Sequence, residues 1–211
     1  VIFDMEHGGL SLAQFKTLSI ICKGYDIFPM IRIPETKYNY IARALDLGSY
    51  GIMVPMVNNE SEAKLIVDYS KYPPKGSRGA GFGFAHNNYK SENPIDIIDS
   101  SNKNLINIIQ IESKTGLENV EKIASIDGVD CLWVGHFDLT NFLGVPGQFG
   151  SKIYHDAIDK IVNAARANKK SLGIMVSNKA DLNFYKKLGF NIIAVGTEMS
   201  FLTESIKKLV K

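Results

Sequence analysis

The length, composition and charge of the chain exclude several classes of protein. The chain has 211 residues, of which 45% are hydrophobic and 22% charged, so it can bury a sizeable core and is neither disordered nor fibrous. Its 24 basic and 22 acidic residues are mixed along the chain and leave a formal net charge of +2. We therefore expect one domain over residues 1–211, small charged ligands, and no nucleic acid or membrane partner.

Short apolar segments alternate along the chain with segments of helical period. We predict buried strands over residues 1–3, 28–33, 51–56, 107–111, 131–134, 172–176 and 191–195. Amphipathic helices are predicted over residues 11–24, 59–71, 115–126, 154–170 and 178–189. Asn59 and Ser177 can cap helix starts, and Gly24 and Gly189 fit helix ends. This alternation predicts an α/β fold with a parallel sheet, either a closed barrel or a doubly wound sheet.

The position of the polar residues favours the barrel. Polar side chains lie at or just after most strand ends: Asp4 to His7, Arg32, residues 55–58, Gln110, Glu112, Asp138, Thr197 and Glu198. In a (β/α)8 TIM barrel all these ends surround one pocket, whereas a doubly wound sheet gathers only the groups at its switch point. Because seven strands are visible and the chain opens directly on one of them, we expect the first βα unit to lie upstream of Val1. Residues 71–101 are expected to form an active-site loop and a short helix.

The cysteines and the lack of a long apolar segment bear on the cellular location of the protein. Cys22 and Cys131 lie in apolar segments without the spacing of metal ligands, which predicts reduced, inert thiols. No apolar run has the length of a membrane span, and we expect no signal peptide. The sequence therefore predicts a cytoplasmic protein.

Two carboxylates are spaced by about one βα repeat. Glu112 ends the strand segment NIIQIE, and Asp138 follows the strand segment CLWV. Adjacent strand ends of a parallel barrel bring two such groups together, and two carboxylates with water and substrate oxygens suit Mg²⁺ or Mn²⁺. Gln110 lies two residues before Glu112 and points to the same side. The alternative is that both acids cap helices in ordinary βα loops.

Three further side chains are candidates for the same pocket. Arg32 lies in an otherwise apolar strand, where it needs an anionic partner, either a substrate carboxylate or phosphate or a barrel acid. His7 stands beside acids at a strand end and can act as a general base. Asp46 lies near the end of a helix that leads into the next strand, on the opposite barrel face from His7. That position is typical of a surface capping residue.

Eight segments together resemble the HpcH/HpaI family of divalent-metal-dependent pyruvate aldolases. In order along the chain they are FDMEHGG, MIRIP, ALDLG, GIMVPMVNNESEA, KYPPKGSRGAG, QIES, VGHFDLT and AVGTEMS. The resemblance extends over essentially the whole chain. It implies a (β/α)8 barrel that cleaves a 4-hydroxy-2-oxo acid to pyruvate and an aldehyde.

The resemblance also implies roles for individual residues. The divalent cation, Mg²⁺, Mn²⁺ or possibly Co²⁺, is bound by the positions that match Glu112 and Asp138, and Asp4 matches an acid that holds a water on this cation. Arg32 polarises the keto oxygen of pyruvate, and the backbone amides of Phe137 and Asp138 hold its carboxylate. His7 and Asp46 match a catalytic dyad, which replaces the capping interpretation of Asp46. Family members assemble as homo-oligomers, trimers or hexamers, with active sites near subunit contacts.

The chain departs from the family pattern at two places. His136 and Phe137 stand where the family has a proline and a small residue. Phe137 either narrows or lines the pyruvate pocket, and His136 either adds a ligand or faces solvent. The segment GFGFAHNNYK lacks the arginine of the best-known members, which leaves the aldehyde specificity open.

Three alternatives to this function stay open. An acyl-CoA-using lyase or Claisen-type enzyme has the same architecture. A class I aldolase needs a lysine at a strand end, and Lys114 is the near candidate, although its position favours a solvent-facing side chain. The chain can also be a non-catalytic barrel that binds an oxo acid, or a phosphate at the segment AVGTEM.

Overall fold

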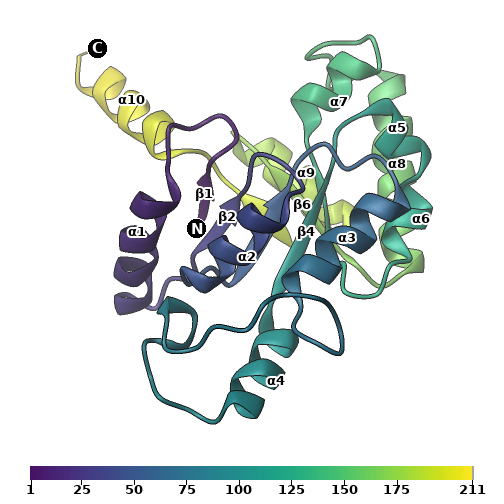
Figure 1. Cartoon of the computed structure of the whole chain (residues 1–211). Helices are drawn as coiled ribbons and strands as arrows, with labels where there is room; N and C mark the ends of the chain where they lie inside the picture. Colours follow the sequence, from purple (N-terminus) through teal and green to yellow (C-terminus); the bar gives the residue numbers. More distant parts are fainter. Residues whose placement is uncertain (211) are drawn as a thin grey trace.

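A computed structural model describes residues 1–210, in which seven parallel strands form one curled, open sheet (Figure 1). The strands are short, and most of them carry apolar side chains on both faces, which is typical of a sheet covered by helices. Their bounds are β1 Ile2–Asp4, β2 Met30–Arg32, β3 Gly51–Val54, β4 Ile106–Ile111, β5 Cys131–Val134, β6 Ser171–Met175 and β7 Ile192–Ala194. Each predicted strand is therefore present, with ends that differ by at most two residues.

Helices connect the strands and cover the outside of the sheet (Figure 1). The predicted helix over residues 115–126 is divided into two short helices, and helix 178–189 is capped by Asn178 rather than Ser177. The bounds are α1 Leu12–Gly24, α2 Tyr38–Asp46, α3 Glu60–Ser70, η1 Ala85–Asn87, α4 Pro94–Asn104, α5 Lys114–Glu118, α6 Val120–Ala124, α7 His136–Phe142, α8 Lys152–Ala167, α9 Lys179–Leu188 and α10 Glu198–Leu209. Gly189 ends α9 with a positive φ of 99°, as a helix-terminating glycine does.

The strand order excludes the doubly wound alternative. Neighbouring strands follow one another along the chain from β1 to β7, and each pair is parallel. A doubly wound sheet reverses its strand order at a switch point, whereas a barrel keeps this sequential order. Within residues 1–210, β1 and β7 are the edges of the sheet. The eighth strand and the unit upstream of Val1 stay predictions.

The two faces of the sheet bury different sets of side chains. The larger core cluster lies between the strands and the helices and includes Ile31, Ile52, Ile109 and Leu132. The smaller cluster lies on the inner, concave face and contains Met53, Ile108, Cys131 and Trp133. Because successive residues of a strand alternate between faces, Gln110 shares the inner face with Ile108. The inner face is thus apolar over most of its length and becomes polar toward the carboxyl ends of the strands.

On the inner face, Gly173 leaves room for the ring of Trp133. A Cβ placed on Gly173 would overlap the ring of Trp133 and come within 3.1 Å of the Cys131 sulfur. We expect Gly173→Ala to lower the free energy of unfolding by about 1–3 kcal/mol, because a packed interior has no space for the methyl group. Urea denaturation measures this. Gly24→Ala is the control, since its Cβ would meet no atom within 4 Å. An equal loss in both variants would contradict the packing argument.

Residues 71–93 form a long connection that contains only the short helix η1. They lead from the end of α3 to α4, which in turn precedes β4, so they lie at the amino ends of the strands (Figure 1). The polar residues that follow the strands lie at the other end. Within one chain the loop is therefore remote from these polar residues, and its role as an active-site loop stays a prediction. The short helix expected in this segment is present as α4.

Other expectations concern single residues and the last helix. Cys22 and Cys131 are both buried and free, and burial raises the pKa of the Cys131 thiol, as expected of inert packing. Lys114 is exposed to solvent. In the described part of the chain, no helix combines the length and apolar character of a membrane span. Helix α10 projects from the body of the protein in Figure 1, and none of its residues is buried.

Candidate active site

The first part of the site is the loop that follows β1. Asp4 ends the strand, and its Oδ1 atom accepts the backbone N–H of Glu6 at 2.9 Å and that of His7 at 3.5 Å. This local turn is typical of aspartate and fixes the direction of the loop. Gly8 is required just beyond it, because a Cβ there would lie 2.5 Å from the Asp4 carbonyl oxygen. The loop therefore holds three titratable side chains in a defined arrangement at the strand end.

Arg32 connects this loop to the neighbouring strand. Asp4 and Arg32 are register partners in β1 and β2, and Nε and Nη2 of Arg32 donate to Oδ1 and Oδ2 of Asp4 at 2.8 and 2.7 Å. Nη1 of Arg32 lies 2.9 Å from Oε2 of Glu6. The alternative of an internal ion pair is thus confirmed. Two of the five guanidinium N–H groups are free of these contacts and could still meet a substrate.

The charge of Arg32 affects its two acidic partners differently. Burial alone would raise the pKa of Asp4, but the hydrogen bond and the charge of Arg32 outweigh burial and lower it. Burial raises the pKa of Glu6 despite the Arg32 charge, and the charges of Asp4 and Asp138 add to this effect. Asp4 is therefore the firmly ionised partner of the guanidinium, whereas Glu6 has the greater tendency to hold a proton.

Removing the guanidinium is expected to destabilise the chain. Arg32→Met leaves two partly buried carboxylates facing each other, and we expect the free energy of unfolding to fall by about 1–3 kcal/mol. Urea denaturation with circular dichroism measures the change. Lys37→Met is the matched control, because Lys37 pairs with Glu35 at the surface, where ion pairs contribute about 0–1 kcal/mol. Equal stability of Arg32→Met and the parent chain would show that the ion pairs of Arg32 do not stabilise the fold.

Glu112 is the most deeply buried acid of the site, with 1% of its surface exposed. Its Oε1 accepts the backbone N–H of Met56 at 2.7 Å, and its Oε2 accepts a short hydrogen bond from Nε2 of Gln110. Burial raises the pKa of Glu112, and the negative charges of Glu6 and Asp138 raise it further. Met56 takes a positive φ of 53°, a strained backbone for this residue type, at the point where its N–H meets the carboxylate.

The residues around Glu112 fit a divalent cation. A buried carboxylate close to two further acids is costly unless a positive charge compensates it. Within residues 1–210 no group of three or more His, Cys, Asp or Glu side chains can hold a metal ion, so a cation here would rest on two carboxylates. Proteins commonly hold Mg²⁺ through one or two carboxylates, because this ion retains several of its waters. Gly135 keeps the space open, since a Cβ there would lie 2.6 Å from Glu112 Cβ and closer still to Oε2.

Asp138 and Phe137 lie in the first turn of α7, directly after β5. The first backbone N–H groups of a helix have no carbonyl partner within the helix, so those of Phe137 and Asp138 can meet a carboxylate. Phe137 as a whole is 57% exposed. It packs at 4.6 Å from His136 and at 5.3 Å from Phe149, measured between ring centroids.

His136 does not simply face solvent. Its ring is half-buried between Phe137 and Phe149, with a centroid distance of 5.0 Å to Phe149. Burial lowers the pKa of His136, which favours the neutral ring. The solvent-facing alternative is wrong because the two phenylalanine rings cover the imidazole.

Asp46 lies apart from His7 within the chain. It ends α2, at the amino ends of the strands, and its Oδ1 accepts from Nη2 of Arg78 at 2.6 Å. The His7 side chain is 66% exposed at the carboxyl ends, and its Nε2 lies 3.8 Å from Oε2 of Glu6. One chain therefore does not join these two residues as a dyad. Its carboxyl-end site contains Asp4, Glu6, His7, Arg32, Gln110, Glu112 and Asp138.

Three members of the site were not singled out from the sequence. Glu6 could have been found from its neighbours, since an arginine inside a barrel needs more than one acceptor. Gly135 carries a weaker signal, because a glycine directly after a strand is common. The Met56 N–H carries none, since a backbone donor depends on a positive φ that no sequence pattern indicates.

A parallel sheet with sequential strand order and carboxylates at the carboxyl ends of its strands is typical of a barrel enzyme. The family model of the HpcH/HpaI aldolase/citrate lyase family matches residues 1–204. The chain is 34% identical over 209 residues to a 5-keto-4-deoxy-D-glucarate aldolase of Shigella boydii, which covers 99% of this chain and 80% of that protein. The chain belongs to the HpcH/HpaI aldolase/citrate lyase family, which confirms the resemblance and the enzyme class.

Solved structures agree with this family. The structure of an HpcH/HpaI aldolase from Desulfitobacterium hafniense has a TM-score of 0.94 at 26% identity and covers 99% of this chain and 81% of that one. A structure of the citrate synthase SbnG has a TM-score of 0.88 at 24% identity, over 100% of this chain and 81% of that one. The second likeness concerns the fold alone. The fold is therefore common to proteins that carry out different carbon–carbon bond chemistry.

Proposed function

We propose that this chain is a cation-dependent aldolase that reversibly cleaves a 4-hydroxy-2-oxo acid to pyruvate and an aldehyde. The observation that carries this proposal is Glu112, a buried carboxylate beside Glu6 and Asp138 at the carboxyl ends of the strands. The aldolase relatives at 34% identity support the reaction class.

The enzyme must stabilise the negative charge that develops on the substrate as the bond breaks. Breaking the bond between carbons three and four of the substrate leaves a carbanion next to a ketone, which is stabilised only as an enolate with charge on oxygen. A divalent cation, Mg²⁺, Mn²⁺ or Co²⁺, held by Glu112 and Asp138 would supply most of that stabilisation when bound. Which of these ions the chain uses is part of the proposal.

Residues of the chain bind the substrate and orient its keto and carboxylate groups. The free N–H groups of Arg32 donate to the keto oxygen, and Asp4 and Glu6 fix the guanidinium plane. The backbone N–H groups of Phe137 and Asp138 hold the carboxylate of pyruvate. Gln110 donates to Glu112 and keeps its carboxylate in place. Asp4 also accepts a hydrogen bond from a water near the cation.

Proton transfer is assigned to His7, with Asp46 of a second copy as its partner. His7 takes the proton from the 4-hydroxyl group as the bond breaks, and the enolate then takes a proton from water at carbon three to give pyruvate. Asp46 lies at the other end of its own chain, so the dyad requires a homo-oligomer, a trimer or hexamer, in which one copy meets the next. Mixing inactive His7→Ala and Asp46→Ala chains is expected to restore part of the activity. No recovery after subunit exchange would exclude a shared dyad.

The test of the proposed function is pyruvate release from a panel of 4-hydroxy-2-oxo acids. We expect turnover with at least one member of the panel, loss of turnover with EDTA, and recovery on adding Mg²⁺, Mn²⁺ or Co²⁺. Turnover that persists after complete chelation would exclude the mechanism. Borohydride with pyruvate would label a lysine only in a class I enzyme.

A Claisen-type or acyl-CoA-using lyase is the second candidate. The family includes citrate lyases by its description, and a citrate synthase has the same fold. The same site can stabilise the enolate of a thioester, since the charge again moves to oxygen. Turnover with acetyl-CoA or citryl substrates, and none with the oxo acid panel, would favour this candidate.

A further inference from the structure

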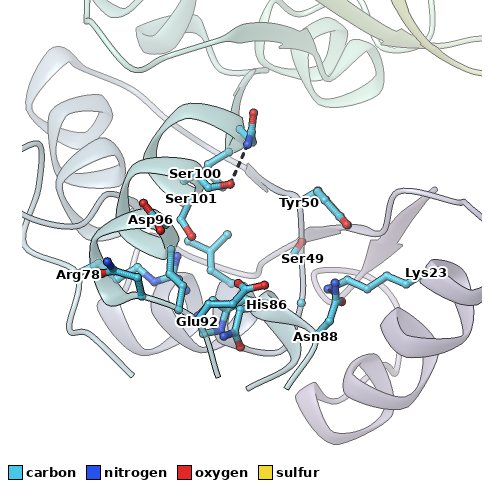
Figure 2. A pocket seen from close by; sticks show the side chains of 17 residues that line it. Lys23, Ser49, Tyr50, Arg78, His86, Asn88, Glu92, Asp96, Ser100 and Ser101 are labelled. Atoms are coloured by element: carbon cyan, nitrogen blue, oxygen red, sulfur yellow. Dashed lines mark hydrogen bonds between the residues drawn. The ribbon is translucent and has the colours of Figure 1, made fainter. Parts of the chain in front are cut away.

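A cavity of about 610 Å³ lies at the amino ends of the strands, away from the carboxyl-end site. It is bounded by the end of α1, the turn before β3, residues 78–93 and helix α4. Figure 2 shows side chains from these segments around the opening, with Lys23 and Arg78 on opposite sides and His86 between them. Its volume falls in the range of cavities that bind small molecules.

Several buried polar atoms at this cavity have no hydrogen-bond partner in the described chain. They are Nε of Arg78, Oδ1 of Asn87 and both ring nitrogens of His86. Arg78 is 4% and Asn87 8% exposed, so these atoms are not simply facing bulk solvent. Buried polar groups are satisfied in nearly all proteins, and leaving one without a partner is unfavourable. The cavity therefore has the properties of a built polar site.

The unpartnered atoms require a ligand that both donates and accepts hydrogen bonds. Arg78 Nε is a donor and Asn87 Oδ1 an acceptor. Burial lowers the pKa of His86, and the neutral ring has one donor and one acceptor nitrogen. The backbone carbonyl of Asp46 lies near the ring, but neither nitrogen makes a well-formed hydrogen bond. Hydroxyl groups meet this mixed demand, whereas a fully ionised anion such as sulfate only accepts.

Lys23 adds a positive charge to the same cavity. Its Nζ donates to the Ala85 carbonyl at 2.6 Å and to Asn88 Oδ1 at 3.3 Å, both neutral groups. Burial lowers the pKa of Lys23, with no contribution from a nearby acid. The ammonium also lies 5.2 Å from the centroid of the Tyr50 ring, so all its partners are neutral. A half-buried ammonium with neutral partners alone favours an anionic group on a ligand. On the other side, Glu92 and Asp96 can accept from ligand hydroxyls (Figure 2).

We propose that this cavity binds a small polyhydroxylated carboxylic acid, with its carboxylate at Lys23 and its hydroxyls at His86, Asn87, Arg78 and Glu92. This cavity lies at the opposite end of the sheet from the carboxyl-end site and does not rest on the proposed function, although its Arg78 also binds Asp46.

Calorimetric titration of the whole chain with D-gluconate in EDTA tests the proposal. We expect one site with a dissociation constant of about 1 mM or tighter. Lys23→Met is expected to weaken binding about tenfold or more, because a charge-assisted hydrogen bond is lost. Lys23→Arg, which keeps the charge, should stay closer to the parent chain, and Glu92→Ala, at an exposed position, should also weaken binding.

The controls separate this cavity from other sites and from other ligands. Lys16→Met changes an exposed lysine of the same helix and should leave the affinity unchanged. Arg32→Lys changes the carboxyl-end site and should also leave it unchanged. No saturation by about 20 mM gluconate, or an equal loss in Arg32→Lys and Lys23→Met, would overturn the proposal. Equal affinity for D-sorbitol, or tighter binding of D-glucose 6-phosphate, would overturn the assignment of a carboxylic acid.

Discussion

Glu112→Gln is expected to lower the rate of pyruvate release by about 10²–10³-fold. Glutamine has nearly the same shape, so it can still accept the Met56 N–H, but it removes one of the two negative charges assigned to the cation. Steady-state turnover with a saturating divalent cation measures the effect, and Mn²⁺ titration calorimetry should show weaker binding in parallel.

The Glu112→Gln variant should remain folded, so a loss of turnover can be assigned to the lost charge. Glu112 is buried close to Glu6 and Asp138, so removing its charge relieves repulsion when no cation is present. We therefore expect the free energy of unfolding in EDTA to be unchanged or raised. Glu118→Gln, at the exposed end of α5, is the control for a general charge effect. Unchanged turnover in Glu112→Gln would remove the basis of the proposed function.

Gly135→Ala is expected to reduce turnover by about 10²-fold through a single added methyl group, because small displacements of a catalytic group have effects of this size. The new Cβ would overlap the Glu112 carboxylate and lie 2.7 Å from Nε2 of Gln110. Both side chains are almost fully buried and have no space to move aside. We also expect the free energy of unfolding to fall by about 1–3 kcal/mol.

A matched glycine separates the two effects of this substitution. Gly150→Ala places its Cβ where no atom lies within 4 Å, so its activity and stability should equal those of the parent chain. Turnover and urea denaturation of both variants give the comparison. If Gly135→Ala kept full activity, the position of the Glu112 carboxylate would not matter for the reaction.

The strands could be predicted from the sequence because each is a short apolar run that ends at a change of polarity. The segments around Ile52, Ile109 and Leu132 are buried on both faces, and this makes them conspicuous. The exact helix ends are harder to predict from the sequence. Either of two adjacent polar residues can accept the backbone N–H groups of the first turn. Asn178, rather than Ser177, does so in α9.

The site was predictable where a residue type conflicts with its surroundings. Glu112 and Arg32 are charged residues at the ends of apolar strands, and both lie in the carboxyl-end cluster. The pairing of Arg32 with Asp4 depends on strand register, which local sequence does not determine. Residues 71–93 have no periodicity, so their sequence does not tell at which end of the sheet they lie. The dyad of His7 and Asp46 stays a prediction, since it needs more than one chain.

The open sheet has a consequence for local unfolding. Strands β2 to β6 have a neighbour on each side, whereas β1 and β7 have one neighbour each within residues 1–210. Amide hydrogens in β4, where five of six residues are buried, should therefore exchange with deuterium last. Those of β7, which has no fully buried residue, should exchange early. Protection would thus decrease from the middle of the sheet toward both margins, and the β1 loop that carries His7 would belong to the more labile part.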